Sequence, residues 1–428
     1  MYDSSYSGSV KVIHAADLHL DSPFLGLERY EGAPVEELVG ATRAAFVNLV
    51  DFALNEEVSL VLLAGDIYDG DWPDYNTGLF FAAQLKRLQD ANVRVVIVSG
   101  NHDAASVISK HLRLPANATV LSHAKPQVVT FDDLGIAVTG QSFGSREVTD
   151  DLSQAFPNRV EGLFNFALLH TSADGRPGHE RYAPCKPAEL ALRGYDYWAL
   201  GHVHNREIVA ETPWIVFSGS LQGRHAREIG AKGFFLIEIE SNVVASVTPV
   251  DVDVVRWDVI TLDLADAVTI DDVTAAFAES ATQALSGAEG RLVAARVVLL
   301  GATPAHAALV RDPDGLRAQL CEAAIEVADS RLWIEKIQIK TSAPTRVTQL
   351  VGRDESTTDL IAALRDTDKD VELAALVETL TPLRAKLPID LRTTDDGMDV
   401  GGAEHVASLI PQIEALLRLE LSQPETAP

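Results

Sequence analysis

Seven side chains that could bind divalent metal ions follow short apolar segments of this sequence. They are Asp17, His19, Asp66, Asn101, His170, His202 and His204. Carboxylate, imidazole and amide groups together form a ligand set that suits divalent manganese, iron or zinc. Seven groups are enough for two ions whose remaining positions hold water and a substrate oxygen. The residue types therefore predict a site for two divalent metal ions.

Asp66 is the residue best suited to contact both ions. One carboxylate oxygen can share its lone pairs between two cations, whereas a neutral imidazole nitrogen serves one. With Asp17 and Asp66 as the only two carboxylates, two divalent ions leave the site with a net positive charge, which attracts a phosphate ester. A hydroxide that bridges the ions would attack the phosphorus in line. The predicted reaction is the hydrolysis of a phosphoester.

His102 and Asp69 are predicted to supply the proton chemistry. Each lies close in sequence to a predicted ligand, since His102 follows Asn101 and Asp69 comes three residues after Asp66. A neighbouring carboxylate favours the protonated form of an imidazole. We expect His102 to donate a proton to the leaving oxygen or to stabilise charge in the transition state, with Asp69 as the residue that orients it.

Alternating strands and helices must position these side chains. Apolar segments predict strands at residues 11–15, 60–64 and 93–98, and helical spacing predicts helices at residues 35–55 and 74–90. In an α/β sheet of this kind the carboxyl ends of the strands meet at one edge, where ligands bind. Further strands are predicted at residues 127–131, 136–140, 164–169, 197–200, 214–218 and 233–240.

The composition changes near residue 250, where a second region begins. The pattern there predicts strand, helix, strand, helix and strand, at residues 258–264, 270–285, 292–300, 315–328 and 332–341. Two leucine-rich stripes beyond it predict helices. The predicted domains are a disordered leader (1–9), a metal-binding domain (10–250), a small α+β accessory domain (251–345) and a helical tail that docks a partner (346–428).

The charge balance of the 428 residues is strongly acidic. Lys and Arg number 35 against 62 Asp and Glu, which gives a formal net charge of -27. Such a chain repels nucleic acid unless bound metal ions or a basic partner supply positive charge. Only two cysteines are present, there is no signal-peptide pattern, and no apolar run approaches the length of a membrane span. We expect a cytoplasmic protein with no membrane contact.

Five motifs resemble, in order, the signature blocks of the calcineurin-like metallophosphoesterases. They are Asp17-x-His19, Gly65-Asp66-Ile67-Tyr68-Asp69, Gly100-Asn101-His102-Asp103, the single His170, and Gly201-His202-Val203-His204. The resemblance implies an α/β (α+β) four-layer sandwich with a capping domain. It also implies one ion on Asp17, His19, Asp66 and His204, and a second ion on Asp66, Asn101, His170 and His202.

Two further segments resemble the SbcD-type DNA-repair exonucleases, especially their YhaO-like branch. They are residues 14–24 and residues 219–225, the latter followed by Glu228 and residues 232–234. The resemblance implies a manganese-dependent DNA exonuclease or endonuclease subunit, a homodimer, and a partner ATPase of the SMC-like coiled-coil type. Arg224, His225 and Arg227 are then candidate contacts to DNA phosphate, or else residues of a solvated loop.

Two alternatives stay open beside the nuclease. A phosphoesterase for a small substrate, either a cyclic nucleotide or a phosphomonoester, would use the same site. A scaffold for the ATPase without catalysis predicts missing ligands, and all seven are present. Gly70 and Asp103 depart from the pattern of the protein Ser/Thr phosphatases. We expect Asp103 to fix the turn around Asn101, and His14 to be a structural strand residue.

Overall fold

The computed structural model describes residues 9–22, 32–69, 75–105, 113–173, 182–328 and 330–344, with a few positions between 375 and 402. The predicted leader (1–9) lies outside the described residues apart from Ser9, and the predicted tail (346–428) lies almost entirely outside them. The chain divides into two compact units. The first comprises Met1–Val259, Ala284–Ala295 and Ser330–Glu335, and the second comprises Ile260–Gln283, Arg296–Asp329 and Lys336–Pro428.

Two six-stranded sheets form the frame of the first unit. One sheet has the order β12-β11-β1-β2-β3-β4 and the other has the order β5-β6-β7-β8-β10-β9. The first is built from β1 (Val10–Ala15), β2 (Leu60–Ala64), β3 (Arg94–Val98), β4 (Ala118–Val120), β11 (Gly233–Glu240) and β12 (Val243–Asp251). The second is built from β5 (Gln127–Phe131), β6 (Ile136–Gly140), β7 (Phe164–His170), β8 (Tyr197–Gly201), β9 (Glu207–Glu211) and β10 (Trp214–Phe217).

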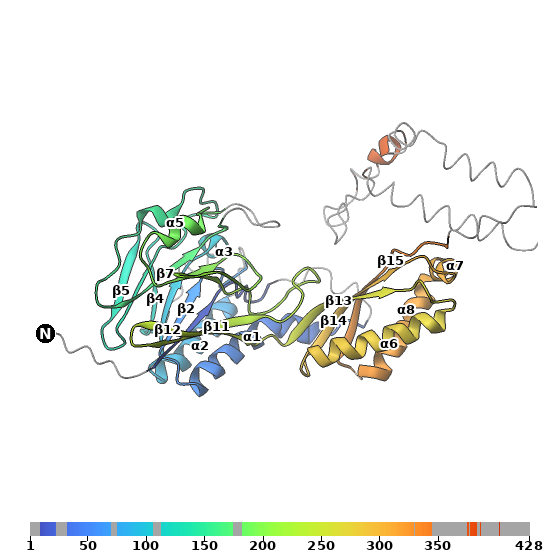
Figure 1. The fold of residues 1–428 in the computed structure, drawn as a ribbon, viewed down its shortest axis with the longest axis horizontal. Coiled ribbons are helices and arrows are strands. Elements are labelled where there is room, and N and C mark those ends of the chain that lie inside the picture. Colours follow the sequence, from blue (N-terminus) through green and yellow to red (C-terminus); the bar gives the residue numbers. More distant parts are fainter. Residues whose placement is uncertain are drawn as a thin grey trace, which may run out of the picture. The chain divides into compact units, whose positions relative to one another are not determined.

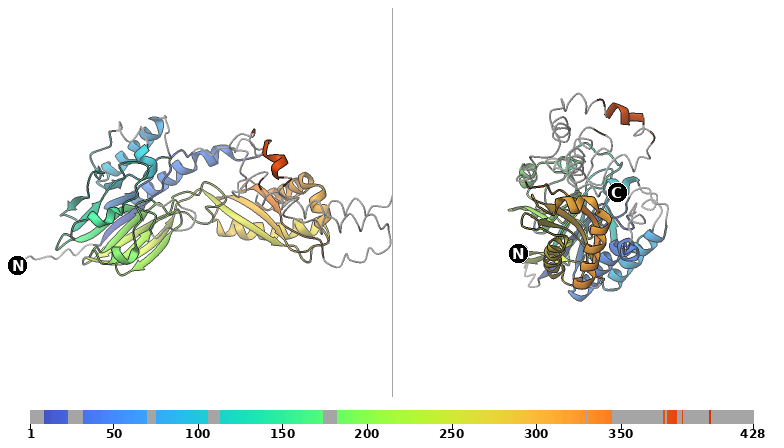
Figure 2. Two further views of the ribbon diagram at one scale, coloured as in Figure 1. Left: turned by 90° about the horizontal axis from the view of Figure 1, so that it is seen from above. Right: turned by 90° about the vertical axis from the view of Figure 1, so that its right-hand side faces the viewer.

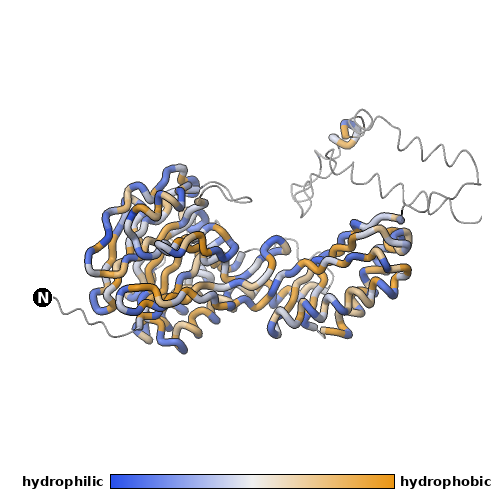
Figure 3. Tube along the Cα trace, in the orientation of Figure 1, coloured by the Kyte–Doolittle hydropathy of each residue, from blue (hydrophilic) through white to orange (hydrophobic). Residues whose placement is uncertain are grey.

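The central strands of both sheets are parallel, which brings their carboxyl ends to one edge. β1, β2, β3 and β4 pair in parallel, and β6, β7, β8 and β10 do the same. Antiparallel strands close the sheets: β11 pairs with β1 and β12 pairs with β11, while β5 and β9 are the two edges of the second sheet. Parallel strands of this kind are buried on both faces, in agreement with their apolar sequences (Figure 3).

Three buried cores separate four layers. Leu62 of β2 belongs to one core with Phe166 of β7, between the two sheets. Leu63, which points to the opposite face of β2, belongs to a second core with Phe46 of α1. The outer face of the second sheet contributes Leu169 to a third core, which it shares with residues of the short segments η2 (Leu152–Ala155) and α5 (Pro187–Ala191).

Two amphipathic helices form the outer layer on the first sheet, α1 (Val35–Asn55) and α2 (Tyr75–Asp90) (Figures 1 and 2). Their apolar residues recur every three or four positions and so face the sheet. The rings of Phe46 and Phe81 stack at a centroid distance of 5.4 Å where the helices meet. The predicted four-layer α/β sandwich is therefore confirmed.

A third sheet, in the region after residue 250, has three strands in the order β13-β14-β15. These strands are β13 (Val255–Asp263), β14 (Leu292–Leu300) and β15 (Leu332–Ile339), and the helices α6 (Ile270–Gly287), α7 (His306–Arg311) and α8 (Pro313–Ala328) connect them. The order of strands and helices agrees with the sequence pattern, with α7 as an addition. No helix in the described part of the chain is long and apolar enough to cross a membrane.

His14 lies in the core between the two sheets and is fully buried. Its Nε2 is 3.2 Å from the carbonyl oxygen of Leu200, which can only accept a hydrogen bond, so Nε2 is the protonated nitrogen. Its Nδ1, 3.1 Å from the Tyr197 hydroxyl, is then the acceptor. Burial lowers the pKa of His14 to about 3. The predicted structural role agrees with these contacts.

His14 is expected to make the stability of the protein depend on pH. The folded protein holds this ring neutral while the unfolded chain protonates it below its usual pKa of 6.5, so folding is favoured above pH 6.5 and loses stability as the pH falls toward 3. The loss should be about 1.4 kcal/mol for each pH unit in that window. Urea unfolding of wild type and His14→Gln at pH 7.5, 5.5 and 4.5 measures it, because the variant lacks this titration. If the free energy of unfolding fell equally with pH in wild type and in His14→Gln, the assignment of this pH dependence to His14 would be refuted.

Candidate metal centre

All seven predicted ligands lie at carboxyl ends of strands from the two sheets. Asp17 and His19 follow β1, Asp66 follows β2, Asn101 begins α3 (Asn101–Ala105) after β3, His170 ends β7, and His202 and His204 follow β8. Six of the seven are buried, and His204 is partly exposed. The structure thus brings together every residue of the predicted ligand set.

Several of these residues have left-handed backbone conformations, which non-glycine residues rarely adopt. Their φ angles are 51° at Asp17, 43° at His19, 53° at Asp66 and 96° at His202. Hydrogen bonds between the loops hold this geometry, since the N–H groups of Asp17 and His19 donate to the carbonyl oxygens of Gly65 and Asp66, at 3.0 Å each. Strained backbone of this kind tends to cluster at functional sites.

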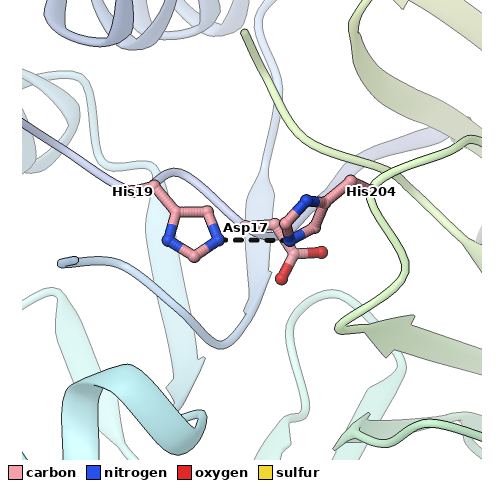
Figure 4. Close-up of side chains that lie close together, drawn as sticks. All are labelled: Asp17, His19 and His204. Atoms are coloured by element: carbon pink, nitrogen blue, oxygen red, sulfur yellow. Dashed lines mark hydrogen bonds between the residues drawn. The ribbon is translucent and has the colours of Figure 1, made fainter. Parts of the chain in front are cut away.

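Asp17, His19 and His204 form one group that could hold a metal ion. The Nε2 atoms of His19 and His204 face each other at 3.3 Å, with the carboxylate of Asp17 beside them (Figure 4). Burial raises the pKa of Asp17, and burial together with the nearby Arg224 charge lowers the pKa of His19 well below its usual value. A neutral His19 has a ring nitrogen with a lone pair to offer a cation.

Asp66, His170 and His202 form a second group that could hold a metal ion. The Nδ1 of His170 is 2.9 Å from the carbonyl oxygen of Ala64, so Nδ1 carries the proton of the neutral ring. Its Nε2 nevertheless faces two further acceptors, Asn101 Oδ1 at 3.0 Å and Asp66 Oδ2 at 3.5 Å. Three electron-pair donors that converge without a proton between them fit a bound cation.

Asp66 belongs to the second group and also lies close to the first. Its Oδ2 is 3.5 Å from Nε2 of His170 in one group and 3.9 Å from Nε2 of His19 in the other. Its Oδ1 accepts a hydrogen bond from the backbone N–H of His102 at 3.0 Å. The donor atoms therefore fit two divalent ions that share one carboxylate.

His102 and Asp69 form a histidine–carboxylate pair beside these groups. The Nδ1 of His102 is 3.0 Å from Asp69 Oδ1. Burial disfavours the protonated ring, but the contact with Asp69 and the charge of Asp66 outweigh it and raise the pKa of His102. Burial likewise disfavours the charged form of Asp69, yet contacts with His102, Ser22 and Arg224 lower its pKa to about 2. The pair therefore favours an imidazolium beside an ionised carboxylate.

The same pair also belongs to a third group that could hold a metal ion, together with His19. The Nδ1 of His19 is 3.8 Å from Asp69 Oδ1 and has no hydrogen-bond partner among the described residues. The geometry alone thus allows Asp69 and His102 either to bind a cation or to act on a substrate.

Comparison with known proteins agrees with this geometry. A family model described as calcineurin-like phosphoesterase matches residues 10–206, and one described as the middle domain of metallophosphoesterase YhaO matches residues 257–342. The chain is 30% identical over 347 residues to the metallophosphoesterase YhaO of Bacillus subtilis (strain 168). The aligned region covers 79% of this chain and 83% of the relative. The chain belongs to the calcineurin-like metallophosphoesterases.

Other relatives of this metallophosphoesterase match a smaller part of it. The DNA double-strand break repair protein Mre11 of Saccharolobus solfataricus is 25% identical over 55% of this chain and 61% of its own length. That of Sulfolobus acidocaldarius is 26% identical over 44% of this chain and 49% of its own length. A solved structure of a dimetal phosphatase from Danio rerio is 12% identical over 56% of the chain and 97% of its own, with a TM-score of 0.35, too low to establish a common fold.

The three predicted DNA-contacting residues of this metallophosphoesterase lie in different surroundings. The side chain of Arg224 is 15% exposed, and its Nη1 is 3.3 Å from Asp69 Oδ2. The side chain of His225 is 48% exposed, and Arg227 is exposed. Arg224 is thus part of the metal-centre surroundings, while His225 and Arg227 face solvent.

Asp103 connects the loops that carry Asp66 and Asn101. Its Oδ1 accepts hydrogen bonds from the N–H groups of Ile67 and Tyr68 at 2.9 and 3.0 Å, and its Oδ2 accepts from the N–H of Gly100 at 3.0 Å. Burial and the charge of Asp66 raise its pKa to about 6. These contacts agree with the predicted role of Asp103 in the turn.

Two neighbours of the site were not predicted to act in it. Glu228 contacts the ring of His204, and the hydroxyl of Ser22 donates to Asp69. Both lie in the segments that carry the family resemblance. The sequence holds no signal for their contacts, because each contact joins loops from distant parts of the chain.

The backbone of Gly100 approaches Asp66 so closely that no side chain fits. A Cβ at this position would lie 2.2 Å from Asp66 Oδ1. We expect Gly100→Ala to displace the Asp66 carboxylate, to weaken metal binding about 10- to 100-fold and to destabilise the protein by about 1–3 kcal/mol.

Titration of the metal-free protein with manganese, together with urea unfolding, measures both effects. Gly40→Ala is the matched control, because a Cβ there meets nothing within 4 Å and helix α1 should gain about 1 kcal/mol. Wild-type metal affinity in Gly100→Ala would contradict the role given to this close approach.

Proposed function

We propose that this metallophosphoesterase binds two divalent ions and hydrolyses a phosphodiester. The observation that carries the proposal is the position of Asp66 Oδ2, 3.9 Å from a ring nitrogen of one ligand group and 3.5 Å from a ring nitrogen of the other. In the proposed assignment one ion would be held by Asp17, His19 and His204, the other would be held by Asn101, His170 and His202, and Asp66 would contribute to both.

The bound ions would supply Lewis-acid chemistry and a strong nucleophile near neutral pH. The protein contributes the proton chemistry and the charge balance. Asp69 contacts Nδ1 of His102, which leaves the Nε2 of that ring to donate a proton to the leaving oxygen. Because the pKa of His102 is raised, the ring carries this proton at a higher pH than a free histidine would.

We further propose that the substrate is DNA and that the protein is an exonuclease or endonuclease subunit in DNA repair. The relatives named as DNA double-strand break repair proteins support this substrate. The motif resemblance supports manganese as the metal, a homodimer, and an SMC-like coiled-coil ATPase as partner. The low cysteine count supports a cytoplasmic location. Because the chain has a net charge of -27, the ions and the partner would have to attract the DNA backbone.

The same charge favours a second candidate function, the hydrolysis of a small phosphoester. A cyclic nucleotide or a phosphomonoester carries few charges, so the acidic surface repels it far less than it repels a nucleic acid. The metal ligands would be the same in both cases, so only the substrate distinguishes the two candidates.

Hydrolysis of three substrates side by side tests the proposal. They are linear duplex DNA, a cyclic nucleotide and a phosphomonoester such as p-nitrophenyl phosphate, each with manganese, magnesium or a chelator, and with Asp66→Asn as the inactive control. Cleavage of DNA that needs a divalent ion and Asp66 supports the nuclease. Activity confined to the small substrates would refute the nuclease and leave the phosphoesterase, and no metal-dependent activity on any substrate would refute both.

A further inference from the structure

The loop between β10 and β11 brings a glutamate and an arginine to the metal centre. The side chains of Glu228 and Arg224 are only 7% and 15% exposed. The Oε1 of Glu228 is 2.6 Å from Nδ1 of His204, and its Oε2 accepts a hydrogen bond from the backbone N–H of Arg224 at 2.8 Å. Glu228 has no place in the ligand set, so its contact with a predicted ligand needs its own explanation.

The Glu228 contact determines which nitrogen of His204 offers its lone pair to a cation. Two groups contact Nδ1 of His204: the Glu228 carboxylate, which can only accept, at 2.6 Å, and Nη2 of Arg224, which can only donate, at 3.3 Å. Because the contact with Glu228 is much shorter, we assign the proton to Nδ1, and Nε2 keeps its lone pair. The Nε2 faces His19 Nε2 at 3.3 Å, on the side of the ring where the first ligand group lies (Figure 4). Glu228 therefore holds His204 in the tautomer that a metal ligand requires.

The backbone of His204 is held by other residues. Its carbonyl oxygen accepts hydrogen bonds from the N–H of Ser220 at 3.2 Å and from Nζ of Lys232 at 3.1 Å. These backbone contacts do not involve Glu228, whose carboxylate contacts the imidazole ring instead.

Arg224 connects this pair to the second histidine–carboxylate pair. Its Nη2 is 3.2 Å from Glu228 Oε1, and its Nη1 is 3.3 Å from Asp69 Oδ2. Asp69 in turn contacts Nδ1 of His102. One guanidinium thus links the carboxylate partner of a predicted metal ligand to the carboxylate partner of the predicted proton donor.

We propose that Glu228 is a positioning residue for His204, and that Arg224 makes the His204–Glu228 and His102–Asp69 pairs act as a unit. The inference rests on the proposed function, because it takes His204 as a metal ligand. Carboxylates that orient a metal-binding histidine contribute a factor of about 10 to 100 to metal affinity. Loss of Glu228 should lower the affinity only for the ion that the group of Asp17, His19 and His204 would hold.

Calorimetric titration of the metal-free protein with manganese tests the first part. Wild type should show two binding events. In Glu228→Ala we expect one event to weaken about 10- to 100-fold while the other is unchanged. Glu228→Gln should lose less, because its amide oxygen can still accept the hydrogen bond from Nδ1. Asp196→Asn is the control, since it changes another carboxylate–arginine contact, 2.9 Å from Arg159, at the opposite end of β8 from His202 and His204.

The tautomer of His204 is a readout that a purely structural role would not change. Nitrogen-15 spectra of histidine-labelled, metal-free protein should show the Nδ1-protonated form in wild type and a mixture in Glu228→Ala. Unchanged affinities and an unchanged tautomer would overturn the inference, and if Glu228→Ala does not fold, Glu228→Gln decides in the same way. Wild type that binds fewer than two ions would overturn the proposed function instead.

A double-mutant cycle tests the link through Arg224. The effects of Asp69→Asn and Glu228→Gln on kcat should depart from additivity by about tenfold while Arg224 is present, because both carboxylates contact it. In an Arg224→Met background the two effects should multiply independently. Additive effects in both backgrounds would show that the pairs act separately.

Discussion

Asp66→Asn is expected to reduce kcat for hydrolysis at least about a thousandfold and to leave fewer than two divalent ions bound. Asparagine keeps the volume of the side chain and tolerates the left-handed backbone at this position, where φ is 53°. It offers a neutral oxygen in place of the charged one that lies between the two ligand groups. Two divalent ions would then repel each other without a shared negative charge.

Metal content after desalting, measured together with kcat, checks this expectation. Asp133→Asn is the control, because it removes a carboxylate that is 61% exposed and pairs with Arg94 at the surface. Asp66→Ala should behave like Asp66→Asn with about 1 kcal/mol of added instability, since alanine disfavours the left-handed backbone. Two ions bound to Asp66→Asn with wild-type affinity would show that Asp66 does not bridge.

His102→Asn is expected to reduce kcat by about 10²- to 10⁴-fold while both ions stay bound. The variant removes the ring that Asp69 orients, but it leaves the two ligand groups on either side of Asp66 complete. The His102 ring also belongs to the third group that could hold a cation, so the number of bound ions distinguishes the two roles. Loss of an ion from His102→Asn would identify His102 as a ligand.

Asp69→Asn is the companion to this experiment. Asp69 contacts His102 without lying between the two ligand groups, so the loss in kcat should be smaller and the ions should remain. If Asp69→Asn lost its ions as completely as Asp66→Ala, the separation of the two aspartates into a bridge and an orienting residue would be wrong.

Local sequence pattern predicted most of the central elements because their boundaries depend on nearby residues. The helix at residues 35–55 and the strand at residues 233–240 have the predicted ends, since apolar periodicity and flanking glycine or proline define them. β12 (Val243–Asp251) was missed because it is a half-exposed edge strand that contains Pro249. It forms by pairing with β11, and β4 and β9 are edge strands of the same kind.

The sequence predicted the residues of the candidate site more completely than the fold that positions them. Because parallel strands end at one edge, the rule that polar residues follow buried strands was enough to collect all seven ligand candidates. The strand pattern by itself did not reveal that two sheets supply them, nor the left-handed backbone at residues such as Asp17 and His202. It also did not reveal the contact of Glu228 with His204, which depends on how a distant loop folds back.

The two sheets meet at the metal centre, and this arrangement affects how the protein could be engineered. Asp17 of the first sheet accepts hydrogen bonds from the backbone N–H of His202 in the second, at 3.0 and 3.1 Å. A small slide of one sheet over the other would therefore separate the ligands. Stabilising substitutions should be sought in the outer core around Phe46, where repacking leaves the sheets in register. The core around Leu62 and Phe166 is the part of the interior with the least freedom to change.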